Sequence, residues 1–184
     1  MMRTFGWPEF LFILEAAKWT IALSAIAFAG GSIVGLMVAL ARTAESRVLQ
    51  FAATVFTQIF QGTPLLLQLF LVFFGAPILG LDINPWLAAA AALILNSGAF
   101  LGEIWRGCIQ AVPRGQLEAA QALSLSYYWR MRDVVLPQAM KIAVAPTVGY
   151  LVQIIKGTSL AAIIGFTEIT RAGQIINLSL IHIS

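Results

Sequence analysis

The feature that most constrains this chain is where its charged residues are absent. No Asp, Glu, Lys or Arg lies within residues 19–41, 48–81 or 83–102 of the 184-residue sequence. A transmembrane helix needs about 20 consecutive apolar residues, so each interval predicts a membrane span, and residues 142–155 predict a shorter fourth one. These intervals are apolar on every face, unlike the amphipathic helices of soluble proteins. We therefore expect an all-α, polytopic membrane protein.

The cations of the chain, which has a net charge of +3, lie mainly between the predicted spans. The first connection holds Arg42 and Arg47, the second holds only Asp82, and the third holds Arg106, Arg114, Arg130, Arg132 and Lys141. Cytoplasmic loops are enriched in Lys and Arg, so the first and third connections are predicted to be cytoplasmic. Residues 1–18 then form an extracytoplasmic or interfacial segment. This alternation argues against a nucleic-acid-binding surface.

The second interval is interrupted by Gln61-Gly62-Thr63-Pro64. Proline removes an amide donor and glycine adds backbone freedom, so we expect the helix to break or kink there. Freed backbone groups in a membrane are tolerated inside protein or beside a water-filled cavity, which makes the break a candidate transport path. A kink that only aids packing is the alternative. Gly31 and Gly35 have the spacing of a close helix contact, but are equally ordinary membrane-helix glycines.

Polar residues within the predicted spans are candidates for lining such a path, because they usually face the bundle interior or a cavity. The candidates are Thr63, Asn96, Glu103 and Thr158. For each of them a packing role is the alternative. For Glu103 the alternative is an ion pair with Arg106, three residues further along the same helix.

The polar stretch of residues 107–141 separates the third and fourth spans. Pro113 and Gly115 interrupt the preceding helix, residues 116–123 favour a helix, residues 124–126 a turn, and residues 127–136 a second helix that ends before Pro137. We expect a short helical hairpin in the cytoplasm, with Ala119, Ala120, Leu123 and Leu125 exposed. Small apolar residues on a short helix suit docking into the groove of a partner protein.

At this stretch the chain resembles the permeases of ATP-binding-cassette (ABC) importers, in the branch for polar amino acids such as histidine, glutamine and arginine. The resemblance rests on Glu118-Ala119-Ala120-Gln121-Ala122-Leu123 and Val134-Val135-Leu136-Pro137-Gln138-Ala139, which match the family's coupling motif. Residues 61–70, 96–104, 156–160 and 168–174 resemble further blocks of this branch. Ser124 stands where the motif usually has glycine, Gln61 where arginine is commoner, and Gly157 where aspartate is commoner, which removes a carboxylate for a cationic substrate.

The resemblance implies a type I transmembrane domain of five helices, four of them present, and a multi-pass location in the bacterial cytoplasmic membrane. It implies ATPase coupling through Glu118, Ala119, Ala120, Leu123, Ser124, Leu136 and Pro137. The implied partners are the lipid bilayer, a second identical or sister permease, two cytoplasmic ATPases and an extracytoplasmic amino-acid-binding protein. No nucleotide-binding loop of the G-x-x-x-x-G-K-[ST] type is present. We therefore expect a non-catalytic subunit without cofactor or metal, with ATP and Mg on the partner ATPase.

The C-terminal residues depart from this family, in which a linker and a fifth helix would follow residue 177. Residues 178–184 instead resemble a translated sequencing adapter, so we interpret the chain as a gene fragment with the truncated domain at 19–177. His182, the only histidine, is then not native. Without it an intramembrane enzyme lacks a Ser-His pair. A secondary transporter or channel subunit for small polar solutes remains the alternative, since such proteins also contain broken helices.

Overall fold

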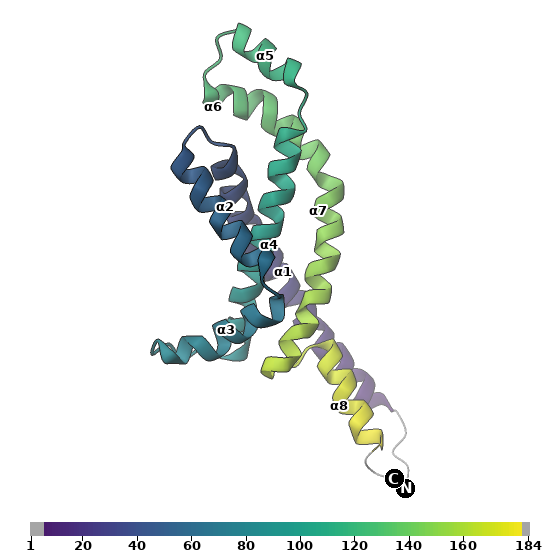
Figure 1. Cartoon of the computed structure of the whole chain (residues 1–184). Coiled ribbons are helices and arrows are strands. Elements are labelled where there is room, and N and C mark those ends of the chain that lie inside the picture. Colours follow the sequence, from purple (N-terminus) through teal and green to yellow (C-terminus); the bar gives the residue numbers. More distant parts are fainter. Residues whose placement is uncertain (1–5, 182–184) are drawn as a thin grey trace.

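The computed structural model describes residues 6–181, and these residues are almost entirely helical (Figure 1). The elements in order are α1 (Trp7–Thr43), α2 (Arg47–Gly62), α3 (Leu65–Ile78), α4 (Pro85–Gln110), α5 (Arg114–Ala122), α6 (Tyr127–Trp129), the π-helical η1 (Arg130–Val135), α7 (Leu136–Thr158), the 3-10 helix η2 (Ser159–Ile164) and α8 (Ile169–Ile181). The molecule is elongated, with α5 and α6 at one end and α8 with the start of α1 at the other.

The predicted membrane spans are confirmed as helices of sufficient length and apolarity. Three helical runs qualify on their own, Trp7–Thr43, Pro85–Gln110 and Tyr127–Ile164, and the pair α2 and α3 makes a fourth if it counts as one bent span. Residues 7–18, which we interpreted as an interfacial segment, continue α1 without interruption. In α4, Asn84 caps the start by accepting from the Leu87 amide at 2.9 Å, and Pro85 occupies the first turn.

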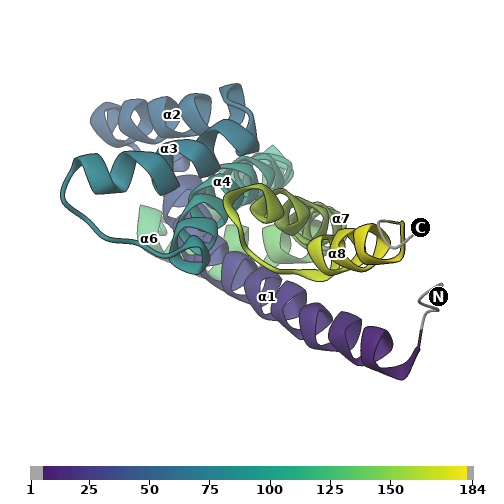
Figure 2. The same ribbon diagram turned by 90° about the horizontal axis from the view of Figure 1, so that it is seen from below.

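Helix α4 lies at the centre, with α1, the α2–α3 pair and α7 around it (Figure 2). The contact between α4 and α1 is especially close because both helices carry glycines where they meet. A Cβ on Gly31 would lie 2.5 Å from the Ser97 Cβ, and one on Gly102 would lie 2.6 Å from Val38 Cγ1. Small residues let membrane helices approach in this way. Gly31 and Gly35 therefore lie in a close contact between two helices, as their spacing suggested.

The predicted break after Gln61 is confirmed. Helix α2 ends at Gly62, α3 begins at Leu65, and the two axes differ by 101°. Thr63 between them is extended, as a residue before proline prefers. The second interval therefore does not cross as one straight helix, and α3 turns sideways from the bundle.

The helical hairpin is also present, with one correction. Helix α5 and the turn agree with expectation, but the second helix does not end before Pro137, and α6, η1 and α7 form one continuous helix from Tyr127 to Thr158. The wider π-helical turns, in which the Leu136 amide bonds the Met131 carbonyl five residues back, accommodate the proline without ending the helix.

The turn at Ser124 forms although glycine is absent. Ser124 adopts φ 55°, and the amides of Ser124 and Leu125 bond the carbonyls of Gln121 and Ala120 at 2.8 and 3.2 Å. This is the Schellman pattern that closes a helix end. At the C-terminal end, α8 extends to Ile181 and so includes residues 178–181 of the suggested adapter segment, whereas residues 182–184, with His182, lie outside the described residues.

Candidate functional site

The break between α2 and α3 is held by the side chain of Gln68 on α3. Its Nε2 donates to the carbonyl oxygens of Phe60 and Thr63 at 2.7 and 3.0 Å and to Thr63 Oγ1 at 2.9 Å. In a regular helix the Phe60 carbonyl would accept from residue 64, but Pro64 has no amide hydrogen. Gln68 thus replaces the bonds that the break removes, as a membrane interior requires.

Asn96 on α4 extends this network to two further helices. The Asn96 side chain is 8% exposed, and its Nδ2 donates to Gln68 Oε1 at 3.2 Å. The Tyr150 hydroxyl of α7 donates to Asn96 Oδ1 at 3.4 Å, and the Tyr150 ring stacks on Phe100 at 5.5 Å. One buried amide therefore connects the break, the central helix and α7.

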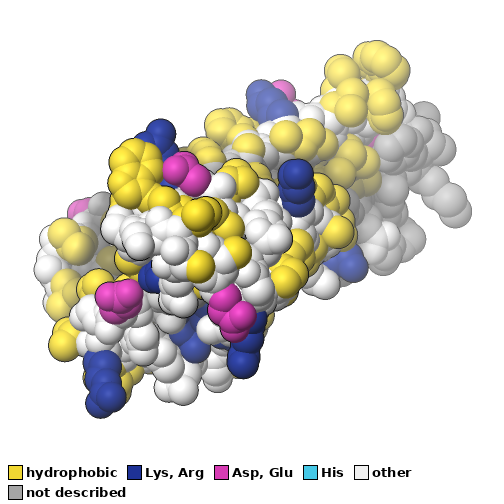
Figure 3. All heavy atoms as spheres, turned by 90° about the horizontal axis from the view of Figure 1, so that it is seen from above, with side chains coloured by type: hydrophobic (Ala, Val, Ile, Leu, Met, Phe, Trp, Pro, Cys, Tyr) yellow, Lys and Arg dark blue, Asp and Glu magenta, His cyan; other side chains and the backbone are white. Residues whose placement is uncertain are grey.

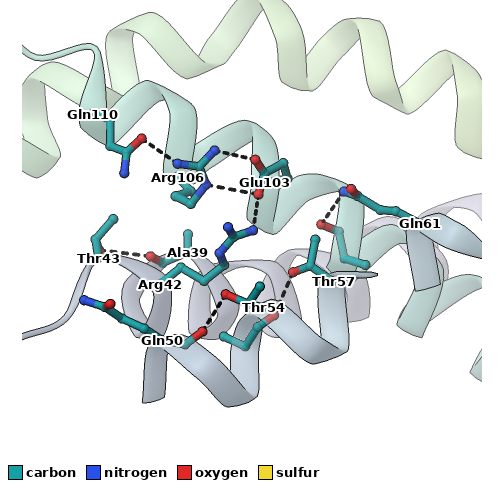
Figure 4. A network of polar contacts seen from close by, with 12 residues as sticks. Ala39, Arg42, Thr43, Gln50, Thr54, Thr57, Gln61, Glu103, Arg106 and Gln110 are labelled. Atoms are coloured by element: carbon teal, nitrogen blue, oxygen red, sulfur yellow. Dashed lines mark hydrogen bonds and ion pairs between the residues drawn. The ribbon is translucent and has the colours of Figure 1, made fainter. Parts of the chain in front are cut away.

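A second connection lies one turn further along α4. Gln61 Nε2 donates to the Ala99 carbonyl oxygen at 3.2 Å (Figure 4). Gln61 and Gln68 thus bind the break to α4 from opposite sides of the extended residue Thr63.

Glu103 forms ion pairs with two arginines. Arg106 on its own helix contacts both carboxylate oxygens, Arg42 reaches in from the end of α1, and Gln110 accepts from Arg106 (Figure 4). The ion pair with Arg106 that the spacing suggested is therefore present, and Arg42 is a partner that sequence reasoning missed. The carboxylate is fully engaged and links α1 to α4.

The four candidate path residues occupy two places. Thr63 and Asn96 meet through Gln68, and Thr158 lies near them, because a Cβ on its neighbour Gly157 would be 3.1 Å from Leu65 at the start of α3. Thr158 is itself fully buried and donates to the Ile155 carbonyl oxygen at 2.7 Å. Glu103 is separate, seven residues beyond Asn96 and so about 10 Å further along α4.

Two exposed polar residues of α7 were not singled out as candidates from the sequence. Gln153 and Lys156 are exposed on α7, on a helical run apolar enough to span a membrane. Polar groups in such segments rarely face lipid. Their position in a long apolar run was the available signal, as it was for Gln68, the single polar residue of residues 65–74.

The predicted docking residues of the hairpin differ in accessibility. Glu118 and Ala119 are exposed and Leu123 is 75% exposed, but Ala120 is only 3% exposed, so the prediction of an exposed Ala120 is wrong. The reason is that α5 packs on η1 along the side that carries Leu117 and Ala120. Ser124 is exposed in the turn, whereas Leu125, Leu136 and Pro137 are half-buried.

The fold and the site define a membrane-spanning subunit with a broken helix and a projecting hairpin. Residues 31–182 match the family described as the inner membrane component of binding-protein-dependent transport systems. The chain belongs to this family and is therefore a membrane permease subunit, which decides against the secondary transporter or channel of the alternative interpretation.

Similar proteins agree with this assignment. The putative glutamine transport system permease GlnP of Rickettsia felis is 36% identical over 94% of this chain and 79% of the relative. The glutamine transport system permease GlnP of Escherichia coli K12 is 37% identical over 91% of the chain and 78% of the relative. A crystal structure of an amino acid ABC transporter with histidines superposes with a TM-score of 0.85 at 31% identity, covering 95% of this chain and 83% of its own. The inward-facing MetNI methionine transporter, at 19% identity and a TM-score of 0.78 over 92% and 82% of the two chains, shares the fold.

Proposed function

We propose that this chain is the permease subunit of an ATP-driven importer that moves polar amino acids, glutamine foremost, across the bacterial cytoplasmic membrane. The glutamine permeases among its relatives and the amino acid transporter structure support this substrate class. The site agrees, because amide side chains predominate around the break and the one carboxylate of the polar network of Figure 4, Glu103, is already engaged by two arginines.

The single observation that carries the proposal is the broken helix near two exposed polar side chains in the otherwise apolar last turns of α7. Non-helical backbone at membrane depth is tolerated only within protein or along a water-filled cavity. Gln153 and Lys156 are exposed on α7, and Gly157, which follows Lys156, lies beside Leu65 at the start of α3. A second permease packed against these side chains would enclose a polar path between the two subunits. Thr63 and Thr158 adjoin this path, and Asn96 supports its wall.

Energy for transport comes from a separate ATPase that binds ATP and Mg, since this sequence has no phosphate-binding loop. The exposed Glu118, Ala119 and Leu123 are the docking contacts of α5. Because α6, η1 and α7 are continuous, movement of the hairpin shifts α7 together with Gln153 and Lys156. An extracytoplasmic binding protein supplies the amino acid.

Reconstitution in proteoliposomes tests this function. The chain should be co-expressed with its ATPase and any sister permease. The proteoliposomes should take up labelled glutamine only when ATP is on the side that carries the ATPase and the binding protein is on the opposite side. An excess of unlabelled arginine should compete much less than unlabelled glutamine. Uptake driven by an ion gradient without ATP would contradict the assignment.

A further inference from the structure

A groove lies between the end of α1, the start of α2 and the segment formed by α6 and η1. Its volume is about 520 Å³. The apolar lining comes from Met37, Leu40 and Leu49 on one side and from Met131 and Leu136 on the other. The groove is separate from the broken helix and from the exposed face of α5, so the proposed transport and docking roles do not account for it.

The groove lies at the level where the membrane spans end. Helix α1 ends at Thr43, whose carbonyl oxygen accepts from the Tyr127 hydroxyl at 3.1 Å. The helical run Tyr127–Ile164 has 38 residues, roughly 57 Å at 1.5 Å per residue, against a hydrocarbon core of about 30 Å. Its first turns therefore extend past the hydrocarbon. Tyr127, Tyr128 and Trp129 follow one another there, and such rings favour the membrane interface.

The segments that form the groove carry excess positive charge. Arg132 lines the groove with a side chain that is 59% exposed, and its Nε lies 3.8 Å from a carboxylate oxygen of Asp133. Arg47 is exposed at the start of α2 and forms no ion pair within residues 6–181. In the sequence segments around the lining residues, Arg47, Arg130 and Arg132 outnumber Glu45 and Asp133, and Arg130 lies 3.8 Å from a carboxylate oxygen of Glu45. Figure 3, which views this end of the molecule, shows cationic and acidic side chains among apolar ones.

We propose that this groove binds an anionic phospholipid, with an acyl chain along the apolar lining and the phosphate beside Arg132. Three observations favour this occupant: the walls are apolar, the groove lies where the membrane spans end, and the exposed Arg132 lines it. The charge distribution of the connections predicts that this boundary is the cytoplasmic one, where basic pockets between spans bind anionic headgroups.

Native mass spectrometry of the detergent-purified full chain tests this site with phosphatidylglycerol and phosphatidylcholine of identical acyl chains. The wild type should retain phosphatidylglycerol about fivefold better, the factor expected from one arginine near the phosphate. Arg132→Gln should bring the ratio close to one. Arg114→Gln is the matched control, because this exposed arginine lies on α5 and does not line the groove.

Two further measurements distinguish a bound lipid from other occupants of the groove. Leu49→Trp fills the groove without changing its charge and should lower retention of both lipids. Millimolar inorganic phosphate should leave phosphatidylglycerol bound; displacement by phosphate alone would identify an anion site and overturn the lipid proposal. Equal retention of the two lipids by the wild type, equal loss in Arg132→Gln and Arg114→Gln, or release of the lipid when the ATPase assembles would overturn it as well.

Discussion

Replacement of Gln68 by leucine removes the group that holds the broken helix while nearly conserving side-chain volume. The Thr63 carbonyl loses its donor, and the Phe60 carbonyl and the Asn96 amide each lose their bond to Gln68 and keep only the 3.5 Å bond between them. At the average of about 0.6 kcal/mol measured for such bonds in membranes, three losses cost about 2 kcal/mol. Leaving the Thr63 carbonyl unpaired adds a further cost of roughly 1–3 kcal/mol. Even the first cost alone changes the ratio of folded to unfolded protein by about 30-fold.

The control is Gln61→Leu, the same change on the other side of the break. Gln61 makes a single bond, to the Ala99 carbonyl, which lies inside α4 and keeps its helical partner. We expect a loss of only about 0.6 kcal/mol. Unfolding in detergent titrated with sodium dodecyl sulfate, followed by tryptophan fluorescence, measures both. If Gln68→Leu is no less stable than Gln61→Leu, Gln68 does not support the break and our account of it is wrong.

Three further predictions concern packing and docking. Ser124→Gly should stabilise the hairpin by roughly 1 kcal/mol, because Ser124 has a left-handed φ, and slower hydrogen exchange of α5 amides would show it; unchanged exchange would argue against strain there. Gly31→Ala should lower stability by about 1–3 kcal/mol, since its Cβ would overlap Ser97, whereas Gly75→Ala has open space; equal melting temperatures would contradict this. Glu118→Gln should leave membrane insertion normal but weaken ATPase association or stimulated ATP hydrolysis. Full stimulation would transfer the docking role to the apolar residues of α5.

The spans and the break were predictable because both follow from local chemistry. Long apolar intervals without charge are most stable in the hydrocarbon core of a membrane, and proline within such an interval has no amide hydrogen to donate. The continuous helix through Pro137 was not predictable in this way, since the π-helical turns that accommodate the proline depend on how η1 packs against α5. Ala120 was misplaced for the same reason: the face of a short helix that is buried depends on its tertiary partner.

The ion pair between Arg42 and Glu103 was within reach of the sequence. Gly31 and Gly35 on one span, and Gly98 and Gly102 on another, repeat at the same spacing, and aligning them in parallel brings the end of α1 beside Glu103. Gln68 was harder to identify. Its three acceptors lie five to eight residues earlier, a separation that no regular helix brings into contact.

The π-helical segment η1 fixes the direction in which the docking hairpin faces. A helix turns by about 100° per residue, and a π-helical turn holds one residue more than an α-helical turn. Deleting one residue within Arg130–Val135 would restore regular winding and rotate α5 by about 100°, a little over a quarter of a revolution, around the α7 axis. The number of residues in η1 therefore sets the direction in which α5 faces. A partner surface that fits one orientation of α5 would meet the wrong side of this helix in the other.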